Sequence, residues 1–178
     1  SGPHLNEGDL FLSKGTTLKG FGRGASIPST TWASGGDVNN ARSRFGGATN
    51  ATQTAGLIFG SGSSPYGQTE EYNGSTWAEQ TDLNTGRYIM YGGGGTQTAG
   101  ILSGGIKAPA NTNSAENEYY NGSSWSEQTD LNEGRQEVMG LGVYNAALAI
   151  CGEPGSGTRV GKVEQWDGSS WTEVGDVN

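Results

Sequence analysis

Residues 72–87 read Tyr-Asn-Gly-Ser-Thr-Trp-Ala-Glu-Gln-Thr-Asp-Leu-Asn-Thr-Gly-Arg, and residues 120–135 repeat them as Tyr-Asn-Gly-Ser-Ser-Trp-Ser-Glu-Gln-Thr-Asp-Leu-Asn-Glu-Gly-Arg. A shorter copy occupies residues 166–173, and a partial copy occupies residues 32–42. One tryptophan recurs in each copy, at spacings of 45, 48 and 46 residues: Trp32, Trp77, Trp125 and Trp171. Periods of about 20–50 residues are typical of stacked or radial repeat proteins. The chain is therefore expected to repeat one structural unit.

Three units align, over residues 40–84, 85–132 and 133–178, and each contains four short segments separated by glycine-rich or polar turns. The first segment of each unit contains an arginine and leads into glycines: residues 42–47, 87–93 and 135–140. The second is the most apolar and is the expected buried strand: residues 55–61, 99–105 and 146–152. The third ends in an aromatic residue and covers residues 69–72, 117–120 and 162–166, and the fourth contains the tryptophan with a glutamate two positions later. Short segments bounded in this way predict β-strands.

Between the third and fourth segments lie Asn73-Gly74, Asn121-Gly122 and Asp167-Gly168. Such dipeptides tolerate positive φ at both positions, so we predict type I′ hairpin turns. A period of this length with four antiparallel strands is typical of one blade of a β-propeller. The predicted fold is all-β, with three four-stranded blades.

The composition limits the possible partners. Hydrophobic residues make up only 31% of the 178 residues and the net charge is −8, and such values ordinarily favour disorder. The tryptophans that recur in phase argue against disorder in this chain. The excess of 18 acidic over 10 basic residues provides no positive surface for phosphate backbones, so we expect no nucleic-acid partner. The longest apolar run, residues 146–151, is far shorter than the roughly 20 residues that span a bilayer, so we expect no membrane insertion.

Catalytic and metal-binding constellations are not expected. Cys151 is the only cysteine and His4 the only histidine, which excludes disulfide frameworks, zinc clusters and nucleophilic triads within the repeats. We therefore expect no enzyme activity, no catalytic residue and no cofactor. A copper-radical enzyme is excluded on the same grounds.

Residues 1–26 lie outside the repeat and are expected to form an N-terminal docking arm, with residues 27–178 forming the repeat domain. Within the arm, two short strands are predicted around Lys14-Gly15. A two-stranded hairpin is marginal alone, so the arm is expected to pack on the repeats or on another chain. Its candidate interface residues are apolar: Leu10, Phe11, Leu12 and Phe21.

The strand count points to assembly. Three copies of the apolar second segment accompany four copies of the tryptophan segment, so the segment around Trp32 is surplus. Three blades are also fewer than the four to eight that close a propeller. We expect either that two or more chains complete a shared ring or stack, with residues 27–39 acting across the interface, or that the chain is part of a longer one.

An apolar strand ending in small residues, followed by Glu/Tyr, Trp and Arg, resembles the kelch motif over about residues 27–178. The glycine doublet is complete only at Gly104-Gly105, while residues 60–61 and 151–152 keep one glycine each. Residues 52–57 and 96–101, joined to the tryptophan and arginine motifs, resemble more narrowly the kelch-like repeats in structural proteins of marine bacteriophages. This resemblance implies a virion protein, such as a tail fibre, an appendage or a capsid-decorating subunit, that assembles with copies of itself and with other virion proteins.

The repeated polar residues favour structure over chemistry. Arg42, Arg87 and Arg135 occur in phase, which is typical of an inter-blade hydrogen bond or ion pair rather than of an anion site. Six acidic residues also obey the period, which indicates exposed strand edges or partners of those arginines rather than a glycosidase pair: Glu79, Glu127, Glu173, Asp82, Asp130 and Asp176. The in-phase aromatic residues are expected to pack between blades rather than to form a sugar-binding surface.

Three loops that break the period, residues 62–68, 106–113 and 153–159, join second to third strands and are expected on one face. Binding groups tend to lie on such loops. The candidate ligand-binding residues are polar or aromatic: Tyr66, Lys107, Asn111, Asn113 and Arg159. Solubilising loops are an equally good interpretation. The alternative function is therefore a carbohydrate-binding, lectin-type module for a cell-surface glycan, which implies a secreted or cell-surface protein instead of a virion component.

Overall fold

The structure is a computed structural model that describes residues 9–13, 17–21 and 34–178. It divides into a unit ending at Ser34 and a unit over Gly35–Asn178. In the first unit, β1 (Asp9–Ser13) pairs with β2 (Thr17–Phe21) in an antiparallel hairpin, with Asp9 opposite Phe21. The description covers only the backbone of Leu10, Phe11, Leu12 and Phe21. Trp32, and with it the predicted surplus strand, lies outside the described residues.

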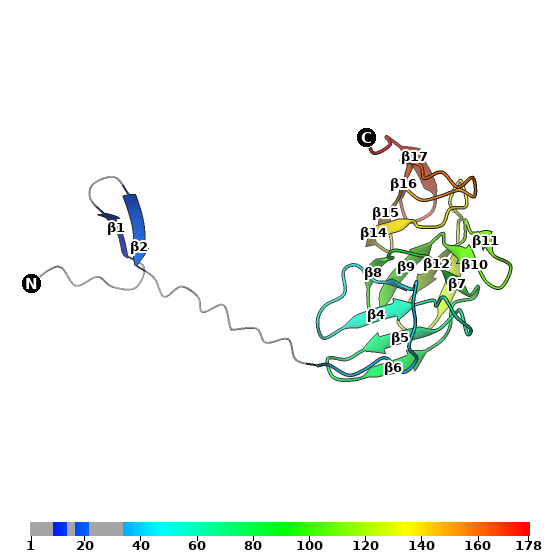
Figure 1. Cartoon of the computed structure of the whole chain (residues 1–178), viewed down its shortest axis with the longest axis horizontal. Coiled ribbons are helices and arrows are strands. Elements are labelled where there is room, and N and C mark those ends of the chain that lie inside the picture. Colours follow the sequence, from blue (N-terminus) through cyan, green and yellow to red (C-terminus); the bar gives the residue numbers. More distant parts are fainter. Residues whose placement is uncertain (1–8, 14–16, 22–33) are drawn as a thin grey trace, which may run out of the picture. The chain divides into compact units, whose positions relative to one another are not determined.

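The second unit contains three four-stranded antiparallel sheets in chain order (Figure 1). The first sheet comprises β3 (Gly46–Gly47), β4 (Gly56–Phe59), β5 (Thr69–Tyr72) and β6 (Trp77–Gln80). The middle sheet comprises β8 (Gly94–Thr96), β9 (Ala99–Ser103), β12 (Asn117–Tyr120) and β13 (Trp125–Gln128). The last sheet comprises β14 (Met139–Val143), β15 (Ala146–Ile150), β16 (Val163–Trp166) and β17 (Trp171–Val174). The described residues contain no helix, so the predicted all-β class is confirmed.

The predicted first segments are partly wrong. The arginines precede the first strands, which begin at Gly46, Gly94 and Met139. In the second repeat, Arg87–Tyr88 forms β7 of a separate sheet with β10 (Ile106–Lys107) and β11 (Thr112–Asn113). The reason is that each arginine side chain is held by a buried glutamate, which removes its residue from the inner strand.

The predicted two-residue type I′ turns are also wrong. Tyr72 pairs with Trp77, so four residues form the loop, and Asn73 N donates to Thr76 O at 3.2 Å. Gly74 has φ +93°, whereas Asn73 is not among the residues with positive φ. Asn73 instead uses its side chain, because its Oδ1 accepts the backbone N–H groups of Ser75 and Thr76 at 3.0 Å. This is the asparagine-capped turn that competes with the two-residue hairpin for the same dipeptide.

The first and middle sheets share a hydrophobic core. Its buried members come from both sheets and their connections: Ala48, Leu57, Phe59, Leu83, Met90, Leu102, Tyr120 and Trp125. The rings of Phe59 and Trp125 meet edge-on at 5.1 Å, and Trp125 Nε1 donates to Thr69 Oγ1 at 2.9 Å. The Tyr120 hydroxyl donates to Glu71 at 2.9 Å. Burial and this hydrogen bond raise the pKa of Tyr120, which keeps the donor protonated.

The middle and last sheets repeat this interface. The core consists of Ile101, Leu131, Val138, Ala147, Ala149, Trp166 and Trp171. With its amide oriented to satisfy both ends, Asn117 accepts from Trp171 Nε1 at 3.3 Å, in the position that Thr69 takes in the first sheet. The predicted packing of aromatic residues between repeats is therefore confirmed for Tyr120, Trp125 and Trp166 as well as Trp171.

Successive repeats are also linked along the backbone just before the first strands. Ile89 N donates to Arg44 O at 2.9 Å, and Glu137 N donates to Ile89 O at 3.0 Å. These three residues occupy the same position in their repeats and have φ of 55°, 55° and 59°. This left-handed conformation is unfavourable for a β-branched residue such as Ile89. The backbone hydrogen bonds between repeats maintain this conformation, because each one fixes two of these residues.

Candidate functional site

The three period-breaking loops contact one another through their side chains or through neighbouring strands. The rings of Tyr66 and Tyr88 lie 6.1 Å apart, and the Tyr88 hydroxyl donates to Asn111 Oδ1 at 2.6 Å. Asn113 Nδ2 donates to the backbone oxygen of Glu153 at 2.7 Å. These three contacts link loop 62–68 through loop 106–113 to loop 153–159, and we call the linked loops the loop belt.

The remaining two candidates are paired with acidic residues. Lys107 Nζ lies 2.5 Å from Glu116 Oε1, and this hydrogen bond helps to lower the pKa of Glu116 against the opposing effect of partial burial. Arg159 Nε lies 2.6 Å from Glu137 Oε2, which raises the pKa of the arginine. Arg159 is 74% exposed in its side chain, so this pair is at the surface. Neither cation is free to neutralise an anionic ligand without leaving its partner.

Glu153 organises the third loop. It accepts hydrogen bonds from Gln136 Nε2 and from the backbone N–H groups of Gly155 and Gly157, the latter two at 2.7 Å. These donors hold the pKa of Glu153 below its usual range, with the Gln136 bond as the largest cause. The carboxylate therefore stays ionised and fixes the loop.

Each repeat contains the same buried pair of an arginine and a glutamate, and an exposed asparagine from the segment before the repeat donates to that glutamate; we call each set of three residues a clamp. The three clamps are Arg42, Glu70 and Asn39; Arg87, Glu118 and Asn84; Arg135, Glu164 and Asn132. In the middle clamp, Arg87 lies 2.5 Å from Glu118 Oε1, both side chains are 0% exposed, and the N and Nδ2 of Asn84 donate to Glu118 Oε2 at 2.9 Å. The arginines form ion pairs, as expected, but each pair lies within one repeat and not between two repeats.

The partners of the arginines were not those expected from the period. Glu79, Glu127 and Glu173 are exposed, as are the three aspartates of the same set. The true partners are Glu70, Glu118 and Glu164, each the second residue of a third strand. The sequence does contain a signal for these partners, because a glutamate occupies the second position of the third strand in all three repeats. Among the described residues, no group of three or more acidic, histidine or cysteine side chains is placed to hold a metal ion.

The last sheet carries an apolar face turned away from the middle sheet. Because Ala147, Ala149, Trp166 and Trp171 face the middle sheet, the alternate residues face the opposite way. Cross-strand pairing places ten residues on this open face: Met139, Ile150, Val163 and Val174; Leu141, Leu148, Gln165 and Thr172; Val143 and Ala146. None of the ten is charged. Met139, Leu141, Val143 and Val174 are between 37% and 41% exposed.

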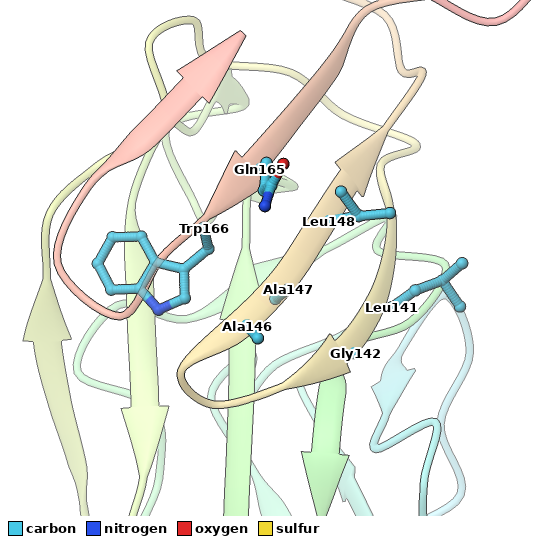
Figure 2. A pocket seen from close by; sticks show the side chains of 7 residues that line it. All are labelled: Leu141, Gly142, Ala146, Ala147, Leu148, Gln165 and Trp166. Carbon is cyan, nitrogen blue, oxygen red and sulfur yellow. The ribbon is translucent and has the colours of Figure 1, made fainter. Parts of the chain in front are cut away.

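A hollow of about 430 Å³ lies at this face. Figure 2 shows the side chains that line it. Leu141, Gly142, Ala146 and Leu148 from the β14–β15 hairpin line it, together with residues of β16. The equivalents of Leu148 in the other sheets, Leu57 and Ile101, are each only 2% exposed because the following sheet covers them. The open face is therefore built like the two buried interfaces but lacks a covering sheet among the described residues.

Comparison with known proteins supports the fold alone. No family model matches the chain, and no curated protein matches it. The solved structure of YjhT is similar, with a TM-score of 0.61 and 13% sequence identity. The alignment covers 78% of this chain and 53% of YjhT, so this chain spans about half the length of that protein. Among the described residues, no helix is long and apolar enough to span a membrane.

Proposed function

We propose that the chain is a non-enzymatic structural protein of a bacteriophage particle, a tail fibre, appendage or capsid-decorating subunit. Its three sheets are kelch-like propeller blades that other chains complete. The observation that carries this proposal is the open apolar face of the last sheet. Monomeric proteins rarely leave a contiguous apolar sheet face uncovered, and such faces mark interaction sites.

Two further observations support a structural role. The polar residues that recur are used in buried clamps and turn caps rather than gathered in a cleft. The repeat motifs also resemble those of phage structural proteins. A chain of this kind supplies surface and shape to an assembly instead of chemistry.

Mass spectrometry of gradient-purified phage particles from cultures that produce this protein tests the proposal. The expected result is that peptides of the chain co-purify with the capsid or tail proteins in stoichiometric amounts. Their absence from intact particles, with the protein recovered only as free chains, would contradict it.

One observation favours the second candidate function, a lectin-type module. The loop belt places two tyrosine rings beside an exposed asparagine, Tyr66 and Tyr88 beside Asn111, and sugars bind through such combinations of ring faces and amide groups. Glycan-array binding should fall about tenfold or more in Tyr66→Ala if the belt binds sugar. Tyr144→Ala is the matched control, because Tyr144 is 47% exposed and lies outside the belt. Equal binding by both variants and the wild type would remove the lectin function.

A further inference from the structure

The first sheet carries the aromatic pair that the open face lacks. Tyr120–Trp125 and Trp166–Trp171, with ring centroids 5.1 and 5.3 Å apart, are buried against the preceding sheet. Tyr72 and Trp77 form the same pair, at 5.0 Å and with a similar tilt, yet both are only partly buried. Within the unit Gly35–Asn178, no four-stranded sheet precedes them.

The open face of the last sheet matches, position by position, the face of the first sheet that the middle sheet covers. Leu148 and Ile150 stand where Leu57 and Phe59 stand in the first sheet, as their cross-strand partners show. Gln165 stands at the position of Glu71, which accepts a hydrogen bond from the tyrosine of the following sheet. The open face thus offers an apolar floor and a side-chain acceptor.

We propose that a second copy of this chain docks the Tyr72–Trp77 face of its first sheet onto the open face of the last sheet. The contact repeats the interface that already joins the three sheets within one chain. In it, Trp77 of the second copy packs on Leu148 and Ile150, and the Tyr72 hydroxyl donates to Gln165. The inference rests on the proposed function as an assembling subunit and names its partner and surface.

The glycine pattern and the backbone links fit this docking. Gly100 lets the middle sheet approach Leu57 closely, since a Cβ at Gly100 would lie 2.8 Å from Leu57 Cδ2. Gly56 occupies the same position in the first sheet and allows the same approach to Leu148. The hydrogen bonds from Ile89 to Arg44 and from Glu137 to Ile89 would continue from Arg44 N of the second copy to the Glu137 oxygen.

One segment must move for the copies to join. Gly35–Asn39 fills the position that the segment leaving a preceding sheet takes, because Asn39 N and Nδ2 donate to Glu70 at 2.8 and 2.9 Å. Asn178 is the repeat equivalent of Asn39, so in the docked pair Asn178 of the first copy would donate to Glu70 of the second copy in its place. In the proposed exchange, Gly35–Asn39 of the second copy moves aside and residues 175–178 of the first copy take its place; residues 34–37 and 175–178 are all exposed.

The contact is heterologous, which permits a mixing experiment. Leu148→Glu places a charge on the open face, and Trp77→Glu places one on the aromatic face. Each variant alone should associate at least about tenfold more weakly than the wild type, measured by sedimentation velocity, because a buried unpaired charge is strongly unfavourable. Mixed together, they should form a one-to-one dimer, since each supplies the face that the other lacks. Ser123→Glu is the control, because it adds the same charge to an exposed turn of the middle sheet.

Near-UV circular dichroism of each variant verifies that its tryptophans remain packed. Folded variants that fail to recover association on mixing would overturn the proposal, as would a wild-type chain that stays monomeric at all concentrations. A further sign is specific to the exchange of segments. Asn39→Ala should strengthen association, whereas Asn178→Ala should weaken it, and the same sign for both would contradict the exchange. Failure here leaves the particle experiment unaffected, so the two proposals can fail separately.

Discussion

The middle sheet and the last sheet have the same strands and the same clamp, but only the middle sheet is covered on both faces. Leu131 follows the last strand of the middle sheet and is 4% exposed, in the core. Val177 follows the last strand of the last sheet at the equivalent position and is 50% exposed. The difference lies in the neighbour and not in the repeat itself. A repeat of this kind buries its hydrophobic residues only when another sheet follows it.

The largest expected effect comes from the clamp of the middle sheet. Glu118→Gln removes the carboxylate that pairs with the buried Arg87 guanidinium. The Nε of Arg87 has no hydrogen-bond partner, so the guanidinium depends on this pair. We expect a loss of about 3–5 kcal/mol in the free energy of unfolding, measured by urea denaturation. Glu79→Gln is the matched control, because Glu79 is exposed, and it should change stability by less than about 0.5 kcal/mol. Equal effects of the two would show that the clamp is not structural.

Truncation at the two equivalent positions separates a covered sheet from an open one. Leu131→Ala should cost about 2–5 kcal/mol because it creates a cavity between the middle and last sheets. Val177→Ala should cost less than about 0.5 kcal/mol in dilute solution, where its side chain is exposed. Thermal denaturation of both variants at low protein concentration measures the difference. A large loss in Val177→Ala would mean that the last sheet is covered in the single chain.

A smaller effect is expected at the tryptophan acceptor. Thr69→Val removes the partner of Trp125 Nε1 and leaves a buried donor unpaired, which should cost about 1–3 kcal/mol. Thr172→Val makes the same chemical change at an exposed position on the open face of the last sheet and is the matched control. That variant should differ from the wild type by less than about 0.5 kcal/mol in dilute solution. Chemical denaturation with tryptophan fluorescence reads both, and no loss in Thr69→Val would show that the hydrogen bond contributes nothing.

The smallest effect concerns the turns. Asp167 accepts the backbone N–H groups of Ser169 and Ser170, and these bonds lower its pKa from 3.8 to about 2. Because the folded pKa is below the unfolded one, this contribution is present above about pH 4 and is lost as the pH falls toward 2. Asp167→Asn, which copies the cap of Asn73, should make thermal stability less pH-dependent between pH 4 and pH 2. An unchanged pH profile would show that the aspartate cap has no part in acid stability.

The repeat period predicted much of the fold. The three copies of the apolar second segment predicted three four-stranded sheets, and the third strands Thr69–Tyr72 and Asn117–Tyr120 have the predicted bounds. The bounds of the first strands were partly wrong because the Arg87 side chain pairs with the buried Glu118, a contact between residues 31 positions apart that local pattern does not reveal. The turn type was missed because an Asn-Gly pair suits two turns equally, and the following serine and threonine decide for the capped one.

The candidate site was predicted less well. Tyr66, Asn111 and Asn113 were named from loops that break the period, and the structure joins those loops in one belt. Tyr88 was not named, because it lies beside an in-phase arginine and was assigned to a strand. The open face could not be predicted, because Leu148 has the same character as Leu57 and Ile101 and differs only in what covers it.

The most direct test of the open face is the oxidation of the two methionines by hydrogen peroxide, followed by mass spectrometry across a range of protein concentrations. Met139 lies on the open face and is 41% exposed, while Met90 lies in the core and is 1% exposed, so the chain contains its own control. Met139 should oxidise quickly in dilute protein and become protected as copies associate, with Met90 slow throughout. Oxidation of Met139 at one rate at every concentration, while association is observed, would contradict the claim that this face joins the copies.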